Sequence, residues 1–395
     1  METGVANSIH RTCPNNMSTT ETAVYFFRAY ITPVLLSIGI PSNLFVFIVF
    51  VRLQKRQACR FNIYVMYLAI AHVFQCIGES LLDHFIGRGL WFASGCTVDF
   101  KLDTQSLFAC KFVSYLPTAT ELLAAVTLVA FTIDRTITIY RPIHSRGDLH
   151  LHYARLGLLL AFVFTFVSFI PAAIYYTLER RPDGKLRCAL VEPTSPGPRY
   201  VILMSVICSY TAPTITILVL NILICYKLKY LIRSSGIKST TSYKQKLERR
   251  RILGHLGVCS FFLCLSIPLV ICMALRQYAD AKNYSETAKE FHKEIVQLTK
   301  FFSSFTAIQY STDIIIYFIF LPNARSEALR LFCGSERLQR FGLIRRIYTK
   351  HVKESSQERR KRMSTIMTRV QDTRCSGRGY SLSNESVSSI SEVPK

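Results

Sequence analysis

The sequence lacks the motifs from which catalytic sites are recognised. It contains no cluster of residues at metal-ligand spacing, no phosphate-binding loop and no nucleophile motif, so we expect neither an enzyme nor a metal or cofactor site. The alternating segments of about ten residues that build an outer-membrane barrel are missing too. The start, METGVANSIHRTCPNN, has no basic stretch followed by an apolar one, which argues against a cleaved signal peptide. The first hydrophobic segment would then act as the insertion signal.

Apolar residues, in contrast, are abundant and arranged in long blocks. Half of the 395 residues are hydrophobic, with 27 Phe and 20 Tyr. The blocks are about 20 residues long or more, which is the length that a helix needs to cross a bilayer. Because a backbone inside lipid must satisfy its own hydrogen bonds, such blocks are expected to be helices. They lie near 24–51, 62–86, 108–133, 155–178, 199–226, 252–275 and 298–321. The sequence therefore predicts an all-α membrane protein with a seven-transmembrane helix bundle.

The formal net charge of +23 is concentrated in alternate connections and in the C-terminal segment. Basic residues in alternate loops fix the orientation of a membrane protein, and basic tracts beside a bilayer attract anionic lipid. The charge therefore indicates membrane lipid as a partner, and no nucleic acid. We expect an extracellular N-terminal segment at 1–23, the bundle at 24–322, a short amphipathic membrane-surface helix at 323–334 and a disordered cytosolic tail at 335–395. The protein should be a multi-pass protein of the plasma membrane.

Modification sites follow from this orientation. Asn16 and Asn283 stand in N-x-S sequons on the outer side and are expected to be glycosylated, whereas the sequon at Asn384 lies in the tail and should stay unmodified. Cys333 ends the amphipathic helix and is either palmitoylated or an inert thiol. The Ser-rich tail contains an Arg-Arg-Lys-Arg-Met-Ser stretch, which is typical of a kinase site.

Short motifs occur in a fixed order along the predicted helices. They include Gly39-Ile-Pro-Ser-Asn43, Asn62 with Leu68-Ala69, Trp91, Asp134-Arg135-Thr136, Pro171, Pro213, Phe262 ahead of Pro268, and Asp313-Ile-Ile-Ile-Tyr317. Their order and spacing resemble the rhodopsin-like (class A) G-protein-coupled receptor family across residues 25–333. The last motif is similar to a variant found in many invertebrate neuropeptide receptors. The resemblance implies an extracellular ligand and a heterotrimeric G protein as partners, and kinases and arrestin on the tail.

The resemblance also implies a switch. Asp134 and Arg135 match the family's DRY motif, and Glu248 stands where many members carry an acid that pairs with its arginine. We expect Arg135 to bridge the third and sixth helices at rest, because a guanidinium stays charged and binds carboxylates bidentately. Pro268 would supply the kink about which the sixth helix swings. The alternative is that Glu248 belongs to a solvated charged run.

Departures from the family's pattern put its sodium site in doubt. His72 replaces the aspartate of the second helix, and Asp313 replaces the Asn of N-P-x-x-Y. The resemblance brings these two residues together, which predicts an imidazole–carboxylate pair with a pH-dependent charge. The alternative is a neutral, hydrogen-bonded histidine without a switching role.

For the ligand, the acids Glu79, Asp83 and Glu121 are decisive. The resemblance directs all three toward the outer pocket, where intramembrane acids should face partners or a wet cavity. A ligand with a basic or amidated end, most simply a peptide, would suit them. The alternative is that they pair with Lys300, Arg276 or His84.

Of the 13 cysteines, most lie within apolar blocks. The resemblance implies a disulfide between Cys110 and Cys188. Cys13 and Cys96 are left over, and a second bridge between them stays open.

Two other functions remain possible from the sequence. Ser266, at the position of the family's toggle tryptophan, and the altered N-P-x-x-Y fit a receptor-like protein with weak or atypical G-protein signalling. A seven-helix transporter is the other alternative, although no internal repeat is visible.

Overall fold

The computed structural model describes residues 13, 17–98, 100–141, 148–180, 184, 186–192, 195–234 and 243–333. The chain divides into two units, Met1–Glu327 and Ala328–Lys395. The first unit contains the helix bundle. Of the second, the structure describes only the end of one helix, so the predicted tail at 335–395 lies outside the described residues.

Seven stretches of helix, which we call spans 1 to 7, make up the bundle. Span 1 consists of α1 (Thr19–Phe26), η1 (Phe27–Ile31) and α2 (Thr32–Arg56), and span 2 of α3 (Arg60–Gln75), η2 (Cys76–Gly89) and α4 (Leu90–Ala93). Span 3 is the single helix α5 (Leu107–Tyr140), and span 4 consists of α6 (Asp148–Ser168) and α7 (Ile170–Tyr175). Span 5 consists of α8 (Pro196–Leu203), η4 (Met204–Thr211) and α9 (Ala212–Ser234). Span 6 is α10 (Tyr243–Ala281), and span 7 is α12 (Lys289–Phe320). The remaining elements are η3 (Leu102–Thr104), β1 (Tyr176–Arg180), β2 (Leu186–Leu190), α11 (Tyr284–Thr287) and α13 (Pro322–Cys333).

The predicted fold class is confirmed. Among the described residues, 6 helices are long and apolar enough to cross a membrane. The number rises to 7 when span 7 and the helix after it, which are joined by a bend of 106°, are counted together as one further crossing. That helix, α13, covers the segment predicted to form the amphipathic helix. Span 1 begins earlier than the sequence suggested, because the Ser18 side chain accepts a hydrogen bond from the Glu21 N–H at 3.3 Å and caps a helix that starts at Thr19.

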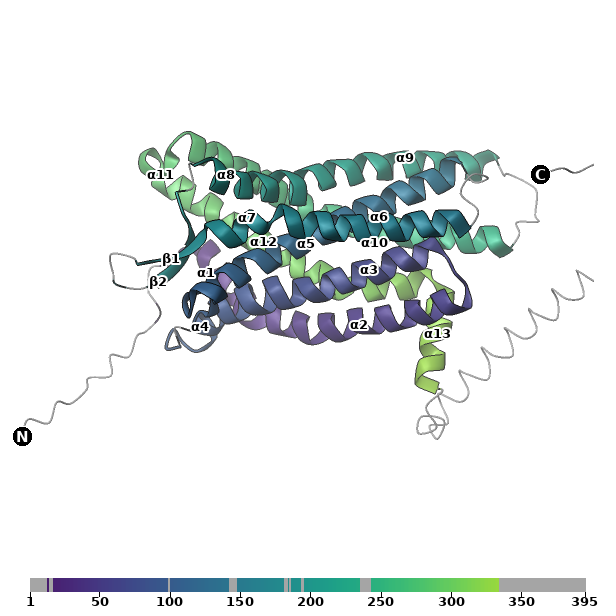
Figure 1. The fold of residues 1–395 in the computed structure, drawn as a ribbon, viewed down its shortest axis with the longest axis horizontal. Coiled ribbons are helices and arrows are strands. Elements are labelled where there is room, and N and C mark those ends of the chain that lie inside the picture. Colours follow the sequence, from purple (N-terminus) through teal and green to yellow (C-terminus); the bar gives the residue numbers. More distant parts are fainter. Residues whose placement is uncertain are drawn as a thin grey trace, which may run out of the picture. The chain divides into compact units, whose positions relative to one another are not determined.

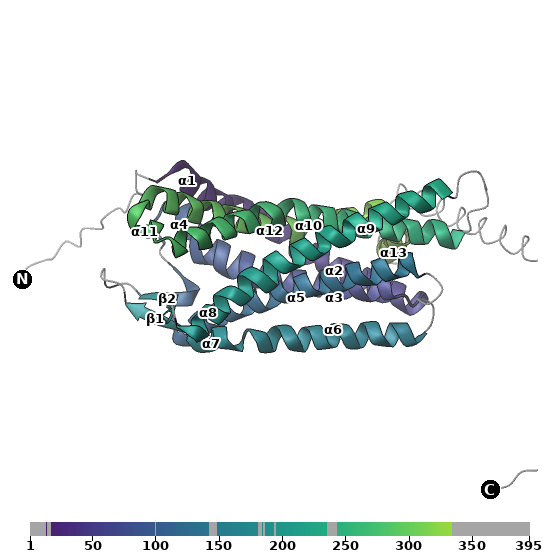
Figure 2. The same ribbon diagram turned by 90° about the horizontal axis from the view of Figure 1, so that it is seen from above.

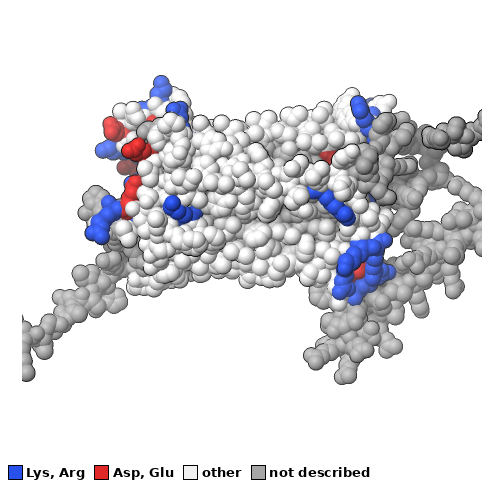
Figure 3. All heavy atoms as spheres, viewed as in Figure 1, with Lys and Arg blue, Asp and Glu red and all other residues white. Residues whose placement is uncertain are grey.

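The bundle has two distinct ends (Figures 1 and 2). We call the end with β1, β2 and α11 the hairpin end, and the end where α3 and α10 begin the tail end. On the face seen in Figure 3, Lys, Arg, Asp and Glu gather toward these ends, and few of them lie on the surface between. Exposed aliphatic and aromatic residues cover the outer faces, including Leu159, Val163 and Ile222. Such a surface suits a lipid environment, in which apolar side chains face outward.

Small residues allow the helices to approach closely. A Cβ atom added to Gly39 in α2 would lie 2.6 Å from Ser311 Oγ in span 7. One turn further, Asn43 donates to the carbonyl of Tyr310 at 2.5 Å and to that of Gly39 at 2.8 Å. Spans 1 and 7 are thus held together by a close backbone approach and a buried amide.

A β-hairpin that the sequence analysis did not anticipate follows span 4. Strands β1 and β2 pair antiparallel, with Leu178 opposite Cys188. Because Cys188 is bonded to Cys110 in span 3, the hairpin is anchored to the bundle.

Candidate functional site

Arg135 is the centre of an ionic cluster at the tail end. Its Nη2 contacts Asp134 Oδ2 in the same helix, and its Nη1 lies 3.0 Å from Glu248 Oε1 in span 6. The side chain of Arg135 is 2% exposed and that of Glu248 35% exposed. The structure therefore brings together the three residues that the sequence analysis placed in a switch, with the third helix linked to the sixth.

Aromatic rings complete the surroundings of Arg135. The centroids of the Phe61 and Phe131 rings lie 5.5 Å and 5.7 Å from its guanidinium carbon. Guanidinium groups stack favourably on aromatic faces, more strongly where water is excluded. The rings and the two carboxylates together stabilise a charge that lies almost out of solvent.

Arg60 belongs to the same cluster, although the sequence analysis did not single it out. It stands at the start of span 2, and its Nη1 lies 2.6 Å from Asp134 Oδ1. No local pattern marks Arg60, because its partner lies on a different helix.

His72 and Asp313 face each other in the middle of the bundle. The distance from His72 Nδ1 to Asp313 Oδ2 is 3.2 Å, and the side chains are 1% and 3% exposed. The ring of Tyr310 lies 5.1 Å from the imidazole. The second and seventh helices therefore meet at the position where the sequence analysis expected this pair.

The other predicted switch residues line spans 6 and 7. Tyr317 is buried, and its ring lies 5.7 Å from that of Phe50. Pro268 lies inside α10, where its missing N–H leaves a carbonyl one turn earlier without a helical partner. Phe262 precedes it by under two turns and is half-buried.

At the hairpin end, two of the predicted ligand-binding acids already have basic side chains near them. Asp83 Oδ1 lies 3.2 Å from Arg88 Nη2, and its other oxygen lies 3.8 Å from His84 Nε2. Glu79 Oε1 lies 3.7 Å from His84 Nε2 and accepts a hydrogen bond from Ser303 at 3.4 Å. One alternative from the sequence was that these acids pair with His84, and His84 does lie near both of them.

Glu121 differs from the other two acids. Its carboxylate interacts with the Tyr210 hydroxyl from span 5, and it makes no ion pair with any residue that the structure describes. The side chain is half-buried. Tyr210 was not predicted, because it lies in η4, a π-helical segment that the hydrophobic pattern does not reveal.

The buried residue Arg28 was also not predicted to belong to the site. Arg28 in η1 is 2% exposed, its Nε donates to Ser304 Oγ at 2.8 Å, and its Nη2 donates to the carbonyl of Lys300 at 3.3 Å. Arg28, Glu79 and Tyr210 all lie in π-helical segments. Such segments are often found at functional sites, since the extra residue in the turn shifts side chains out of helical register.

Two disulfides secure the hairpin end. Cys110 is bonded to Cys188, with Cα atoms 5.4 Å apart, and Cys13 is bonded to Cys96, with Cα atoms 5.2 Å apart. The second bridge joins the segment before span 1 to the loop after span 2. It was the possibility that the sequence left open.

Polar and aromatic contacts add to this second bridge. Thr20 donates to Glu294 Oε2 in span 7 at 2.5 Å, and the ring of Tyr25 lies 5.3 Å from that of Trp91. In the loop between spans 2 and 3, burial and then the charge of Asp83 raise the pKa of the Asp103 carboxyl. The loops at this end are therefore packed structure.

The predicted modification sites are placed as follows. Asn283 is exposed at the start of α11, with a left-handed φ of 54°. Asn16 lies outside the described residues. Cys333 is the last residue of α13. In the described ranges, no group of three His, Cys, Asp or Glu residues has the arrangement of a metal site.

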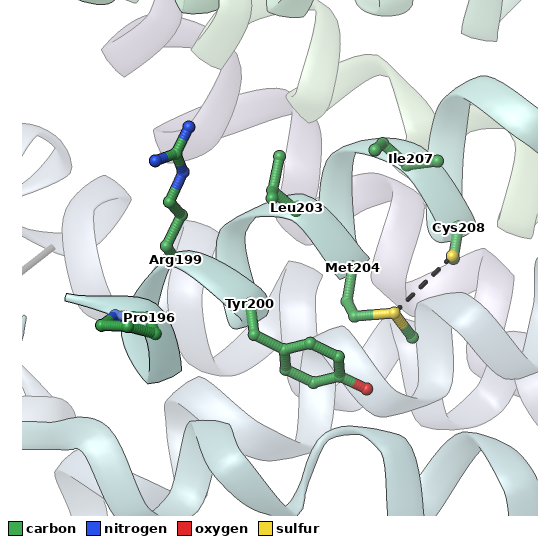
Figure 4. A pocket seen from close by; sticks show the side chains of 7 residues that line it. All are labelled: Pro196, Arg199, Tyr200, Leu203, Met204, Ile207 and Cys208. Carbon is green, nitrogen blue, oxygen red and sulfur yellow. Dashed lines mark hydrogen bonds between the residues drawn. The ribbon is translucent and has the colours of Figure 1, made fainter. Parts of the chain in front are cut away.

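A shallow hollow lies on span 5 (Figure 4). Its volume is about 430 Å³, and its lining is Pro196, Arg199, Tyr200, Leu203, Met204, Ile207 and Cys208. All of these residues belong to α8 and η4, so the hollow is a surface depression lined by one span. None of the acids described above lines it.

Comparison with known proteins adds a family to this geometry. The model of the family described as "7 transmembrane receptor (rhodopsin family)" matches residues 42–309. Melanin-concentrating hormone receptor 2 of Homo sapiens is 30% identical over 198 residues, which are 49% of this chain and 53% of that protein. Melanin-concentrating hormone receptor 1 of Rattus norvegicus is 22% identical over 234 residues, 58% of this chain and 61% of the relative.

A third relative is named for another ligand. Leukotriene B4 receptor 1 of Mus musculus is 24% identical over 185 residues, 47% of this chain and 48% of the relative. The chain matches between 48% and 61% of the length of these relatives.

Proposed function

The chain belongs to the rhodopsin family of seven-transmembrane receptors, and on this premise we propose that it binds an extracellular ligand and activates a heterotrimeric G protein. The contact of Arg135 with Glu248 carries the proposal. It joins span 3 to span 6 by a single charge-assisted pair at the end of the bundle where a cytosolic partner would bind.

We place the hairpin end outside the cell and the tail end in the cytosol. Two observations support this orientation. Both disulfides lie at the hairpin end, and disulfides form in oxidising compartments. The basic residues within 52–60 and 249–251 lie at the tail end, as expected for the cytosolic side of a membrane protein. The plasma membrane is the compartment in which this topology serves a receptor.

The mechanism follows from the geometry of the tail end. In the resting state Arg135 holds Glu248, so span 6 lies against span 3. A ligand that favours the open arrangement shifts the population toward it, and span 6 moves outward about the weak point at Pro268. Arg135 and the surface it covered then become available to the G protein. Tyr317, Phe262 and the pair His72–Asp313 lie along the path between the two ends and are proposed to couple them.

Glu121 is the residue that we propose binds the ligand. It is a half-buried carboxylate between spans 3 and 5, and within the described part of the chain no basic side chain pairs with it. A charge at this depth needs a partner, so a cationic group of the ligand is the chemistry that fits. Because Asp83 already lies beside Arg88 and Glu79 beside His84, we assign these two acids a secondary role in binding.

A peptide with a basic or amidated end remains the ligand class that we propose. Two of the relatives are named for melanin-concentrating hormone and one for leukotriene B4, and the acids near the hairpin end favour a ligand with a basic group. Phosphorylation of the tail by kinases, recruitment of arrestin, attachment of lipid at Cys333 and glycosylation of Asn16 and Asn283 complete the proposal.

The function is tested without knowledge of the ligand. Glu248→Gln removes the acceptor charge and should raise agonist-free nucleotide exchange on a panel of G proteins about two- to fivefold, because a partly exposed ion pair contributes roughly 0.4–1 kcal/mol. If neither the wild-type chain nor Glu248→Gln stimulates exchange on any G protein, while both reach the cell surface, the proposed function is wrong.

A further inference from the structure

The ionic cluster at the tail end extends beyond the pair that joins spans 3 and 6. Charged side chains form one continuous row, in the order Arg60, Asp134, Arg135, Glu248 and Arg251. The distances are 2.6 Å from Arg60 Nη1 to Asp134 Oδ1, 3.0 Å from Arg135 Nη1 to Glu248 Oε1, and 3.2 Å from Arg251 Nη1 to Glu248 Oε2. Each carboxylate is therefore shared between two guanidinium groups, with one oxygen for each.

Arg60 is firmly held at its end of the row. It follows Cys59, whose extended backbone starts α3, and its side chain is 15% exposed. Besides the contact with Asp134, its Nη2 donates to Thr138 Oγ1 at 3.3 Å. The residues in these two contacts belong to span 3. The guanidinium of span 2 is thus fixed on the face of span 3 that presents Asp134.

We propose that Arg60 is a positioning residue of the switch, an inference that rests on the proposed function. By occupying Oδ1 of Asp134, it leaves only Oδ2 for Arg135. A free carboxylate takes both N–H groups of one guanidinium in a bidentate arrangement. Without Arg60, Asp134 binds Arg135 in this way and draws its Nη1 away from Glu248. Arg60 therefore keeps Arg135 directed toward span 6.

The charge of Arg60 does not by itself explain such an effect. Span 6 presents Glu248 and Arg251 as a pair of opposite charges, and the attraction of Arg60 to the one is largely offset by repulsion from the other. Direct Coulomb coupling between spans 2 and 6 is therefore weak. Arg60 must therefore influence the contact between Arg135 and Glu248 through the carboxylate of Asp134, and removing this carboxylate should abolish the influence.

Other groups at this end do not share the role. Arg56 at the end of span 1 lies 2.6 Å from Glu327 and touches no member of the row in the contacts described. It is an arginine at the same end of the bundle with a carboxylate partner of its own. Arg56→Met is for this reason the matched control for Arg60→Met, which removes the guanidinium and keeps a flexible apolar stem.

The experiment measures the position of span 6 without a G protein. Spin labels carried by unnatural amino acids at the exposed positions Tyr153 and Arg250 report the separation of spans 4 and 6 in purified full-length protein in nanodiscs. Arg60→Met should raise the agonist-free population with the longer distance about two- to fivefold, the range for one partly screened ion pair. Arg60→Lys, which still offers a cation to Oδ1, should restore at least half of this difference.

The dependence on Asp134 decides the outcome. In an Asp134→Asn background, and equally in a Glu248→Gln background, adding Arg60→Met should change the distance distribution no further than Arg56→Met does. Equal shifts in all backgrounds, or no shift in the wild-type background, would overturn the positioning role. Agonist-free nucleotide exchange is measured on the same variants. A distance shift without exchange on any G protein would sink the proposed function and leave the role of Arg60 standing.

Discussion

His72 in span 2 and Asp313 in span 7 lie 3.2 Å apart with side chains 1% and 3% exposed. Among the described residues, neither the imidazole nitrogens nor the carboxylate oxygens have a hydrogen-bond partner, so this close approach is the polar contact that each side chain has. Each residue therefore depends on the other. Burial opposes charge on both, while proximity of opposite charges favours it, so the pair is stable only as long as both members are present.

Removing one member of this pair should cost more than removing both. His72→Leu and Asp313→Leu each leave a buried polar group without its partner, a loss of about 3–5 kcal/mol where the remaining group is charged. The double variant leaves an apolar contact, so its loss of stability should be smaller than either single loss, by about 1–3 kcal/mol. Thermal unfolding of the purified variants measures this. Additive losses would mean that the two residues do not form a functional unit.

The same pair should also matter for signalling. His72→Asn keeps a polar side chain but removes the imidazole that faces Asp313, so basal nucleotide exchange should change. Thr127→Val, which changes another buried polar side chain, serves as the control in span 3. Unchanged exchange in His72→Asn would assign the histidine a purely structural role.

The sequence predicted those parts of the fold and site that depend on local pattern or on the order of motifs. Long apolar blocks located the spans, and the spacing of the motifs brought Arg135 near Glu248 and His72 near Asp313. It did not predict Arg60 as a partner of Asp134. That contact depends on the rotation and height of span 2 relative to span 3, which no pattern within either helix specifies.

The hairpin end was predicted less well for a related reason. Helical periodicity assumes a constant turn, whereas η1, η2 and η4 contain wider turns that displace Arg28, Glu79 and Tyr210. The β-hairpin between spans 4 and 5 is short, and its strands pair in a loop that was identified only by its position. The bridge between Cys13 and Cys96 joins two loops whose separation the sequence does not contain.

Close packing of spans 1 and 7 predicts a specific sensitivity at Gly39. Its added Cβ would meet Ser311 Oγ at 2.6 Å, whereas a Cβ at Gly157 meets nothing within 4 Å. Gly39→Ala should therefore destabilise the protein by about 1–3 kcal/mol through overpacking. Gly157→Ala, also within a helix, should be neutral or slightly stabilising. Thermal unfolding compares the two, and equal midpoints would contradict the close approach of the helices.

Loss of the bridge between Cys13 and Cys96 should loosen the hairpin end without unfolding the bundle. Removing a native disulfide typically costs about 2–5 kcal/mol in small domains, and we expect the low end here because the bundle is independently packed. Peptide mapping of the unreduced protein should find Cys13 linked to Cys96. Cys13→Ser and Cys96→Ser should show the same loss singly and together, whereas additive losses would mean that the cysteines act separately.

Glu121 is the position at which ligand chemistry should be most visible. Glu121→Gln keeps the shape and the contact with Tyr210 but removes the charge, so potency of a cationic agonist should fall about tenfold or more, equivalent to roughly 1.4 kcal/mol or more. Asp83→Asn is the contrast, because Arg88 already neutralises that carboxylate. Basic peptides and their analogues with uncharged side chains should be compared in calcium or nucleotide-exchange assays. The loss should occur only for the charged member of each pair, since only this member gains from the carboxylate. Equal losses for both members would assign Glu121 to the packing of spans 3 and 5.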